Sequence, residues 1–296
     1  MTLAKLLPIA INVSIGLIVV GLGMHARFAD VTYLVRRPGL LLRSLLAMNV
    51  IMLFVAAGAA MLLDLDPAVK IAIVTLALSP VPPLLPTKQA QAGGSVSYIT
   101  GLLVTAAALS IVVAPAGFVA IDRLFGGTGA APPGKVAPVV LMGVIGPLLL
   151  GVLVNYLAPE IAKRIAPHVS RVGSVLLVVA VVPILISQRH HILGVLGNGT
   201  GLTLALFTVI GVAVGHLLGG PDPDDRTVLA LATGTRHPGV ALAIATAAFP
   251  QQTSVLAVVL WHLVIGGIVS GPYVKWRQRA NHPRSEPLPV EPGLKR

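Results

Sequence analysis

Two stretches, ALSPVPPLLPTK at residues 77–88 and TGTRHPGV at residues 233–240, are the most informative about how this chain folds. Each interrupts an apolar segment long enough to enter a lipid bilayer. Proline removes a backbone donor and clashes with the preceding turn, so neither segment can continue as one regular helix. Broken helices at membrane depth are tolerated only where they line a cavity or are buried in protein. One such break in each half of a chain indicates the binding site of a transporter.

The composition is that of an all-α polytopic membrane protein. Of the 296 residues, 55% are hydrophobic and 10% are charged, and the mean hydropathy is +0.91. A soluble domain averages about 25% charged residues. The net charge of +11 is dispersed among loops and aromatic residues make up only 4%, so membrane topology explains the charge better than nucleic-acid binding does. The absence of cysteine excludes disulfides and thiolate sites.

Nine apolar segments are long enough to cross a bilayer, which takes about 20 residues. They are predicted near residues 6–26, 39–63, 67–92 (broken), 96–120, 136–158, 168–188, 200–219, 224–250 (broken) and 253–276. Residues 277–296 are rich in Pro, Arg and Glu without apolar periodicity, and are predicted to form a disordered cytoplasmic tail.

The distribution of basic residues sets the orientation. With the N-terminus outside, 13 Lys and Arg residues fall on the inner side of the membrane and four on the outer side. Basic residues accumulate on the cytoplasmic side, so this orientation is preferred over its inverse. We therefore expect an integral plasma (inner) membrane protein with a cytoplasmic C-terminus.

Four further cations lie within or near the apolar segments. Arg43 and Lys70 are near segment ends, where long side chains reach the headgroups. Lys88 and Arg236 lie deeper, and we expect both to be buried cations. A charge at the centre of a span costs at least about 2.5–3.5 kcal/mol, so Arg236 should face a wet cavity or a partner.

No carboxylate lies at mid-membrane, because all ten acidic residues fall in loops, at segment ends or in the tail. A helix that restarts at Pro238 offers unpaired N–H groups beside Arg236, and such an arrangement favours an anion. The first break offers Pro86 and Lys88 in a mirrored order, which suggests inverted repeats. The alternative is that both cations only neutralise helix-end carbonyls where the breaks cross.

Other polar residues complete the candidate site. Thr235 and His237 flank Arg236, and Asn49 and His262 are costly to bury in a span. No P-loop, GxSxG or HExxH motif is present, so we expect no enzyme activity, no cofactor and no metal centre.

Several stretches together resemble the bile acid:sodium symporter family of the wider bile, arsenite and riboflavin transporter group. They are VGLGM at 20–24, FAD at 28–30, RRP at 36–38, LSP at 78–80, RHPGVALA at 236–243 and WH at 261–262. The resemblance implies inverted repeats and two discontinuous helices that cross at mid-membrane. It also implies one transmembrane domain over residues 1–276. Within it, a panel of the segments near 6–26, 136–158 and 168–188 would move against a core near 39–120 and 200–276.

The departures from the family concern its sodium ligands. Matched to this chain, a family glutamate falls on Ala232 and a glutamine four residues later falls on Arg236. A second glutamine falls on Met48, and a Ser-Asn pair falls on Leu85-Pro86. The hypothesis is that Lys88 and Arg236 replace two bound sodium ions.

The sequence thus favours a secondary active transporter or facilitator of a small organic anion, working by alternating access without sodium. Import, export and exchange are all compatible with it. One alternative is a sodium-coupled symporter of a bile-acid-like or keto-acid substrate. Another is a membrane sensor or structural protein that does not transport. The expected partners are the organic anion and the lipid bilayer, with no nucleic acid.

Overall fold

The fold is built from helices joined by turns and short extended segments. The computed structural model describes residues 3–26, 28–82, 85–124, 138, 141–187, 194, 199–249, 251–252 and 254–281. In chain order the main helices are α1 (Leu3–His25), α2 (Phe28–Val31), α3 (Pro38–Leu45), the π-helix η1 (Leu46–Ile51), α4 (Met52–Leu62), α5 (Pro67–Leu78), α6 (Leu85–Gln91), α7 (Val96–Leu124), the π-helix η3 (Leu141–Ile145), α9 (Gly146–Leu157), α10 (Pro159–Ser187), α12 (Thr200–Leu218), α13 (Pro223–Gly234), α14 (Pro238–Ala248) and α15 (Val255–Asn281).

Two helices extend beyond the apolar segments predicted for them. The segment predicted to begin at residue 168 is part of α10, which begins at Pro159 because proline suits a first helical turn. The last helix was predicted to end at residue 276, but α15 continues to Asn281. Its extension is held by the buried side chain of Arg277, which bonds to α13. The remainder of the predicted tail, residues 282–296, lies outside the described residues.

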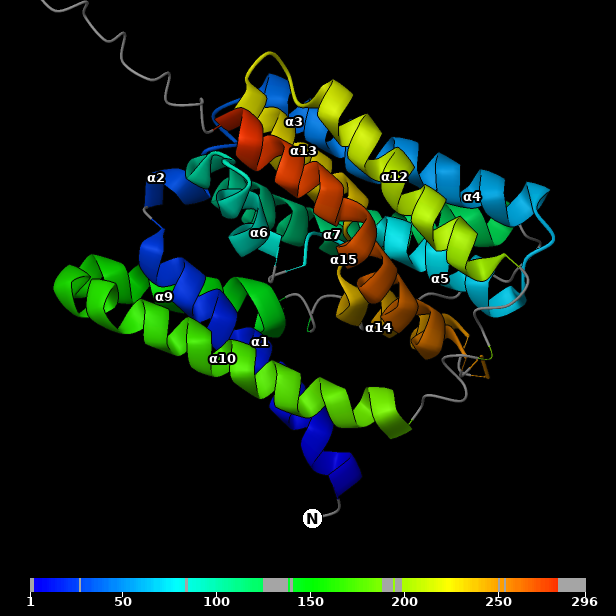
Figure 1. The fold of residues 1–296 in the computed structure, drawn as a ribbon, viewed down its shortest axis with the longest axis horizontal. Coiled ribbons are helices and arrows are strands. Elements are labelled where there is room, and N and C mark those ends of the chain that lie inside the picture. Colours follow the sequence, from blue (N-terminus) through cyan, green and yellow to red (C-terminus); the bar gives the residue numbers. More distant parts are fainter. Residues whose placement is uncertain are drawn as a thin grey trace, which may run out of the picture.

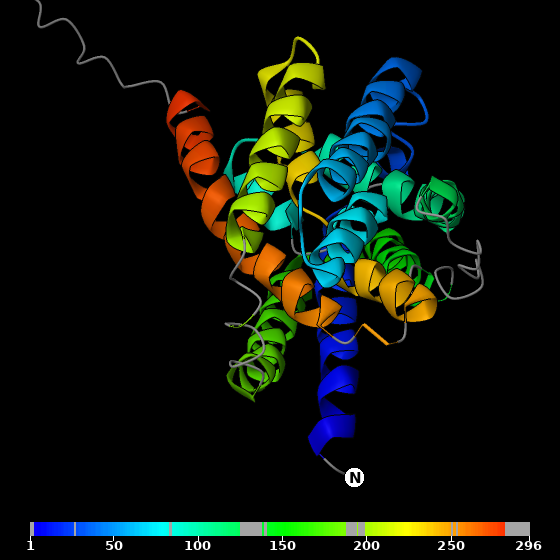
Figure 2. The same ribbon diagram turned by 90° about the vertical axis from the view of Figure 1, so that its right-hand side faces the viewer.

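The helices form two groups, which Figure 1 and Figure 2 show from two sides. The three-helix layer consists of α1, α9 and α10, which pack on one another. It has its own small apolar cluster around Met24, Ala162 and Ala166. The larger bundle contains α3 to α7 and α12 to α15, with the main apolar core. The π-helix η3 contacts α1 and α9 of the three-helix layer. It also contacts α7 of the larger bundle, and so connects the two groups.

The half-helices α5 and α13 are built alike at the centre of the larger bundle. Each has twelve residues, of which nine are buried. Each begins with an Asp-Pro pair in which the aspartate caps the helix: Asp66 accepts from the N–H of Ala68, and Asp222 accepts from the N–H of Asp224. An N-cap carboxylate and a proline in the first turn are both favourable there. Each half-helix then ends at a hydroxyl residue with extended backbone, Ser79 or Thr235.

The surface of the helices is apolar, as expected of an integral membrane protein. Within the described residues, three helical stretches are long and apolar enough to cross a bilayer: 38–62, 200–218 and 255–280. Shorter apolar helices cover 12–25, 67–78, 96–110 and 141–157. Valines exposed along α10 face outward, where lipid tails can cover them.

Candidate functional site

The two breaks predicted from the sequence meet in space. After α5 ends at Leu78, the chain continues through Ser79, whose backbone is extended, to Pro80. After α13 ends at Gly234, it runs extended through Thr235. The backbone N–H of His237 donates to the carbonyl of Pro80 at 3.0 Å, which joins one break directly to the other. Residues 157 positions apart in the chain therefore form one junction.

Arg236 occupies the centre of this junction. The side chain is only 1% exposed, in agreement with the prediction of a buried cation. Its guanidinium donates from Nη2 to the carbonyl of Met48 at 2.5 Å and from Nη1 to the carbonyl of Ser79 at 3.4 Å. Within the described residues, both partners are backbone carbonyls and neither is a carboxylate. Ser79 is the C-cap of α5, where carbonyls carry partial negative charge, and Met48 lies in the π-helix η1, so the cation is held by main-chain oxygens without an acidic side chain.

The carbonyl of Met48 belongs to an irregular turn. Met48 lies in η1, where i→i+5 hydrogen bonds replace the usual α-helical pattern. Such π-helical turns occur frequently at functional sites. Asn49, a predicted site residue, is the next residue in η1 and is half-buried. Asn49 is therefore adjacent in sequence to Met48, which binds Arg236 through its carbonyl, but the Asn49 amide is not among the groups that hold Arg236.

His237 and Pro238 begin the second half of the broken helix. His237 is buried, and its Nδ1 accepts from the N–H of Val240 at 3.3 Å as the N-cap of α14. Pro238 follows at the first helical position, where a missing N–H has no cost. Gly239 is exposed, so the positive end of α14 is accessible beside the junction.

Lys88 does not share the environment of Arg236, and the prediction that it is buried was wrong. It lies in α6 two residues after the buried Pro86, but its side chain is exposed. The orientation of α6 explains this, because its neighbour Gln89 points inward and donates to the carbonyl of Val228 at 2.8 Å. Lys88 Nζ instead lies beside α15, 3.7 Å from where a Cβ on Gly267 would be.

His262, in α15, is another deeply buried polar residue. It is 2% exposed, and its ring contacts that of Phe207 edge-on at 5.7 Å between centroids. Neither ring nitrogen has a hydrogen-bond partner within the described residues. The Nε of Arg236 and the hydroxyl of Thr233 are likewise unpartnered there. A buried imidazole in this condition is poised to hydrogen-bond a ligand, since it has a donor and an acceptor unused.

Sequence comparison identifies the family of this chain. The model of the sodium bile acid symporter family matches residues 12–195, which is more than half of the sequence. The chain belongs to the sodium bile acid symporter family. This confirms the resemblance seen in the short motifs. The family is one of transporters, and a relative, the uncharacterized sodium-dependent transporter YocS of Bacillus subtilis strain 168, is 25% identical over 281 residues. That alignment covers 88% of this chain and 81% of the relative.

The positions that the resemblance matches to the family's sodium ligands can now be located in the structure. Ala232 is fully buried one turn before the break and offers only a methyl group. Arg236 and Met48, matched to two glutamines, contact each other through the guanidinium and the main-chain carbonyl. Leu85 and Pro86, matched to a Ser-Asn pair, are buried and have no side-chain oxygen. The guanidinium therefore lies beside one of these matched positions, Met48.

Two features of the site were not predicted. The carbonyls of Met48 and Ser79 hold Arg236, yet carbonyls carry no signature in a sequence. Helix α12 also packs very closely on α13 through Gly211, Gly215 and Gly219. Their spacing of four residues is the small-xxx-small pattern of membrane helix contacts, so this signal was readable in the sequence.

Proposed function

We propose that this protein is a sodium-independent secondary transporter of a small organic anion, with the Arg236 guanidinium in place of a bound sodium ion. The observation that carries the proposal is the pair of hydrogen bonds from Arg236 to the carbonyls of Met48 and Ser79. A permanently bound cation stabilises the junction of the two breaks at all times, so no dissociable ion is required there. The exposed Lys88 has no such role, and the proposal is limited to Arg236.

The anionic character of the substrate follows from the charges around the junction. Acidic residues of the described chain lie in loops or at helix ends, away from Arg236. The accessible N-terminus of α14 adds positive potential at Gly239. His262, with both nitrogens unused, is assigned to a neutral polar group of the substrate.

The transport cycle is proposed to follow the domain division expected of the family. In this scheme nine segments span the membrane, the three-helix layer is the panel and the larger bundle is the core. The similar construction of α5 and α13, each with an Asp-Pro start and a break 13 residues after the aspartate, supports inverted repeats. The N-terminus is placed outside and the C-terminus in the cytoplasm of the plasma membrane. Rocking of the core against the panel would expose the junction to each side in turn.

The alternative is a sodium-coupled symporter, and one observation favours it. The relative from Bacillus subtilis is named as a sodium-dependent transporter. If this chain also requires sodium, its sodium ligands are carbonyl and hydroxyl oxygens. They would then lie at positions other than those that the resemblance matches to the family's sodium ligands.

Uptake into proteoliposomes separates the two proposals. Thermal-shift screening of bile acids, keto acids and other organic anions first identifies a ligand of the purified protein. Its uptake is then measured with an inward sodium gradient and with an equal potassium gradient. We expect the same rate in both, and loss of uptake in Arg236→Ala. Strict dependence on sodium contradicts sodium independence, and wild-type uptake by Arg236→Ala contradicts the assigned site. Arg171→Ala, an exposed cation on α10, is the matched control.

A further inference from the structure

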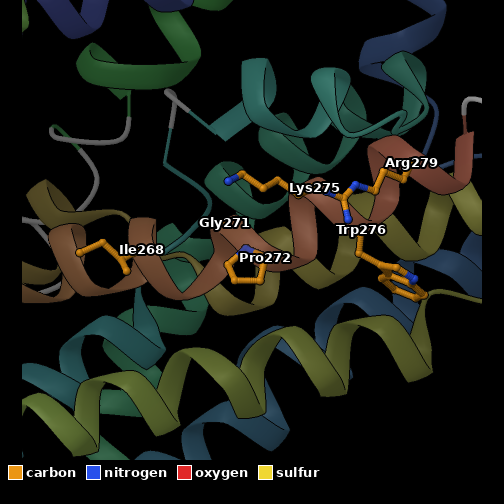
Figure 3. A pocket seen from close by; sticks show the side chains of 6 residues that line it. All are labelled: Ile268, Gly271, Pro272, Lys275, Trp276 and Arg279. Carbon is orange, nitrogen blue, oxygen red and sulfur yellow. The ribbon is translucent and has the colours of Figure 1, made fainter.

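An open cleft lies along α15, away from the junction. It has a volume of about 400 Å³ and is lined by Ile268, Gly271, Pro272, Lys275, Trp276 and Arg279 (Figure 3). The cleft is open at Gly271, because this residue has no side chain and no atom lies within 4 Å of where its Cβ would be. Pro272, inside the helix, also cannot donate to the carbonyl of Ile268.

One end of the cleft is cationic. Lys275 and Arg279 are four residues apart and therefore lie on the same face of α15. Both are exposed, and within the described residues neither forms an ion pair. None of the six lining residues is acidic. Because like charges at this spacing repel each other, an anion bound between them is favoured.

The other end is apolar. Ile268 is 70% exposed and precedes Lys275 by seven residues, which is about 10 Å along a helix. Pro272 lies between them and continues the apolar floor towards the cations.

Aromatic residues indicate where the cleft lies relative to the membrane surface. The ring of Trp276 contacts those of Tyr273 and His216, with centroids 5.6 and 5.5 Å away. The Tyr273 hydroxyl and His216 Nδ1 are hydrogen-bonded at 2.9 Å. Trp and Tyr gather at the level of lipid headgroups. This cluster therefore places Lys275 and Arg279 at headgroup depth and Ile268 at the depth of the acyl chains.

We propose that this cleft binds one anionic phospholipid. Its phosphate lies between Lys275 and Arg279, and an acyl chain runs over Pro272 and Ile268. The charge complementarity at one end and the apolar floor at the other favour a lipid over a soluble anion, which would leave Ile268 exposed. Lys and Arg side chains close to a membrane surface attract anionic lipid headgroups.

Native mass spectrometry of the full chain in neutral detergent tests the proposal. Phosphatidylglycerol and phosphatidylcholine with identical acyl chains are titrated separately, and the Kd of the first bound lipid is compared. We expect phosphatidylglycerol to bind at least tenfold more tightly. In Lys275→Gln/Arg279→Gln this preference should disappear, because each cation is expected to contribute up to about fivefold to it. The control is Arg164→Gln/Arg171→Gln, which removes two exposed cations from α10 and should retain the preference.

Three results would overturn the assignment. The first is an unchanged preference in Lys275→Gln/Arg279→Gln with an unchanged melting temperature. The second is displacement of the lipid by glycerophosphoglycerol at concentrations similar to those of the lipid, which indicates a site for soluble anions. The third is tenfold tighter lipid binding by a chain ending at Asn281, which indicates that residues 282–296, with Glu286 and Glu291, occupy the cleft. Ile268→Asn supplies a check on the acyl end, because it should weaken both lipids several-fold.

Discussion

The guanidinium of Arg236 donates to the carbonyl of Met48 at 2.5 Å, across 188 positions of the chain. This contact connects the break between α13 and α14 with the π-helical turn η1. A second bond, to Ser79, extends the connection to the end of α5. Three separate elements of the larger bundle therefore depend on one cation.

Arg236→Met should destabilise the fold because it leaves two buried carbonyls without these donors. Hydrogen bonds to charged groups contribute about 1.5–3 kcal/mol each, so we expect a loss of about 3 kcal/mol. The melting temperature in neutral detergent measures the effect. Arg171→Met, which changes an exposed cation on α10, should leave the melting temperature unchanged. Equal melting temperatures for both variants would show that Arg236 is not a structural cation.

Restoring the family's ligand types should restore a response to sodium. In Ala232→Glu/Arg236→Gln, a carboxylate and an amide replace the methyl group and the guanidinium at the matched positions. We expect sodium, but not potassium, to raise the melting temperature of this variant, because a bound ion stabilises the state that binds it. The wild-type chain should respond equally to both salts. A sodium-specific increase in the wild type would instead support the sodium-coupled alternative.

Helix ends at the two breaks could be predicted because their causes are local. Pro80 and Pro82 prevent α5 from continuing, and Pro238 begins α14 for the same steric reason. The Asp-Pro pairs at 66–67 and 222–223 are equally local signals, and they align the two halves better than the mirrored order of Lys88 and Arg236 does.

Side-chain direction and carbonyl partners could not be predicted in the same way. Whether Lys88 or Gln89 points inward depends on the rotation of α6, which is fixed by the contact of Gln89 with Val228 in α13. The acceptor at Met48 exists because η1 departs from α-helical geometry, and this depends on how α3 and α4 pack on their neighbours. Both facts arise from tertiary contacts that no short pattern encodes.

Close packing of α12 on α13 makes Gly215→Ala severely destabilising. A Cβ at this position would lie 2.4 Å from the carbonyl oxygen of Leu229 and 2.6 Å from the Cα of Ala230, so backbone atoms would have to separate. Overpacking of this kind costs about 1–3 kcal/mol, and we expect the upper end in melting experiments. Gly58→Ala in α4 is the control, because no atom lies within 4 Å of its Cβ. That variant should be neutral or stabilised by about 0.5–1 kcal/mol.

Arg277 holds the end of α15 against the start of α13. Its Nε donates to the hydroxyl of Thr227 at 2.7 Å and its Nη2 to the carbonyl of Pro223 at 2.9 Å. Arg277→Met should therefore cost about 2 kcal/mol and increase amide hydrogen exchange near residues 223–227. Arg279→Met, two residues later and exposed, should change stability by less than about 0.5 kcal/mol in neutral detergent. Similar effects of the two changes would contradict the anchoring role.

Substitution of His262 can show whether this residue binds the substrate or only packs in the core. The two roles predict different effects on the melting temperature and on ligand affinity. Its nitrogens have no partner within the described residues, so replacing the imidazole by an apolar ring removes an unsatisfied buried group. His262→Phe can keep the edge contact with Phe207 and should leave the melting temperature equal or higher. If the imidazole hydrogen-bonds the substrate, the same variant should weaken ligand-induced thermal stabilisation about tenfold in apparent Kd, equivalent to about 1.4 kcal/mol. His216→Phe is the matched control, since it loses a real hydrogen bond to Tyr273 and should lower stability by about 1 kcal/mol without changing ligand affinity. A destabilised His262→Phe with unchanged ligand affinity would instead assign His262 to packing.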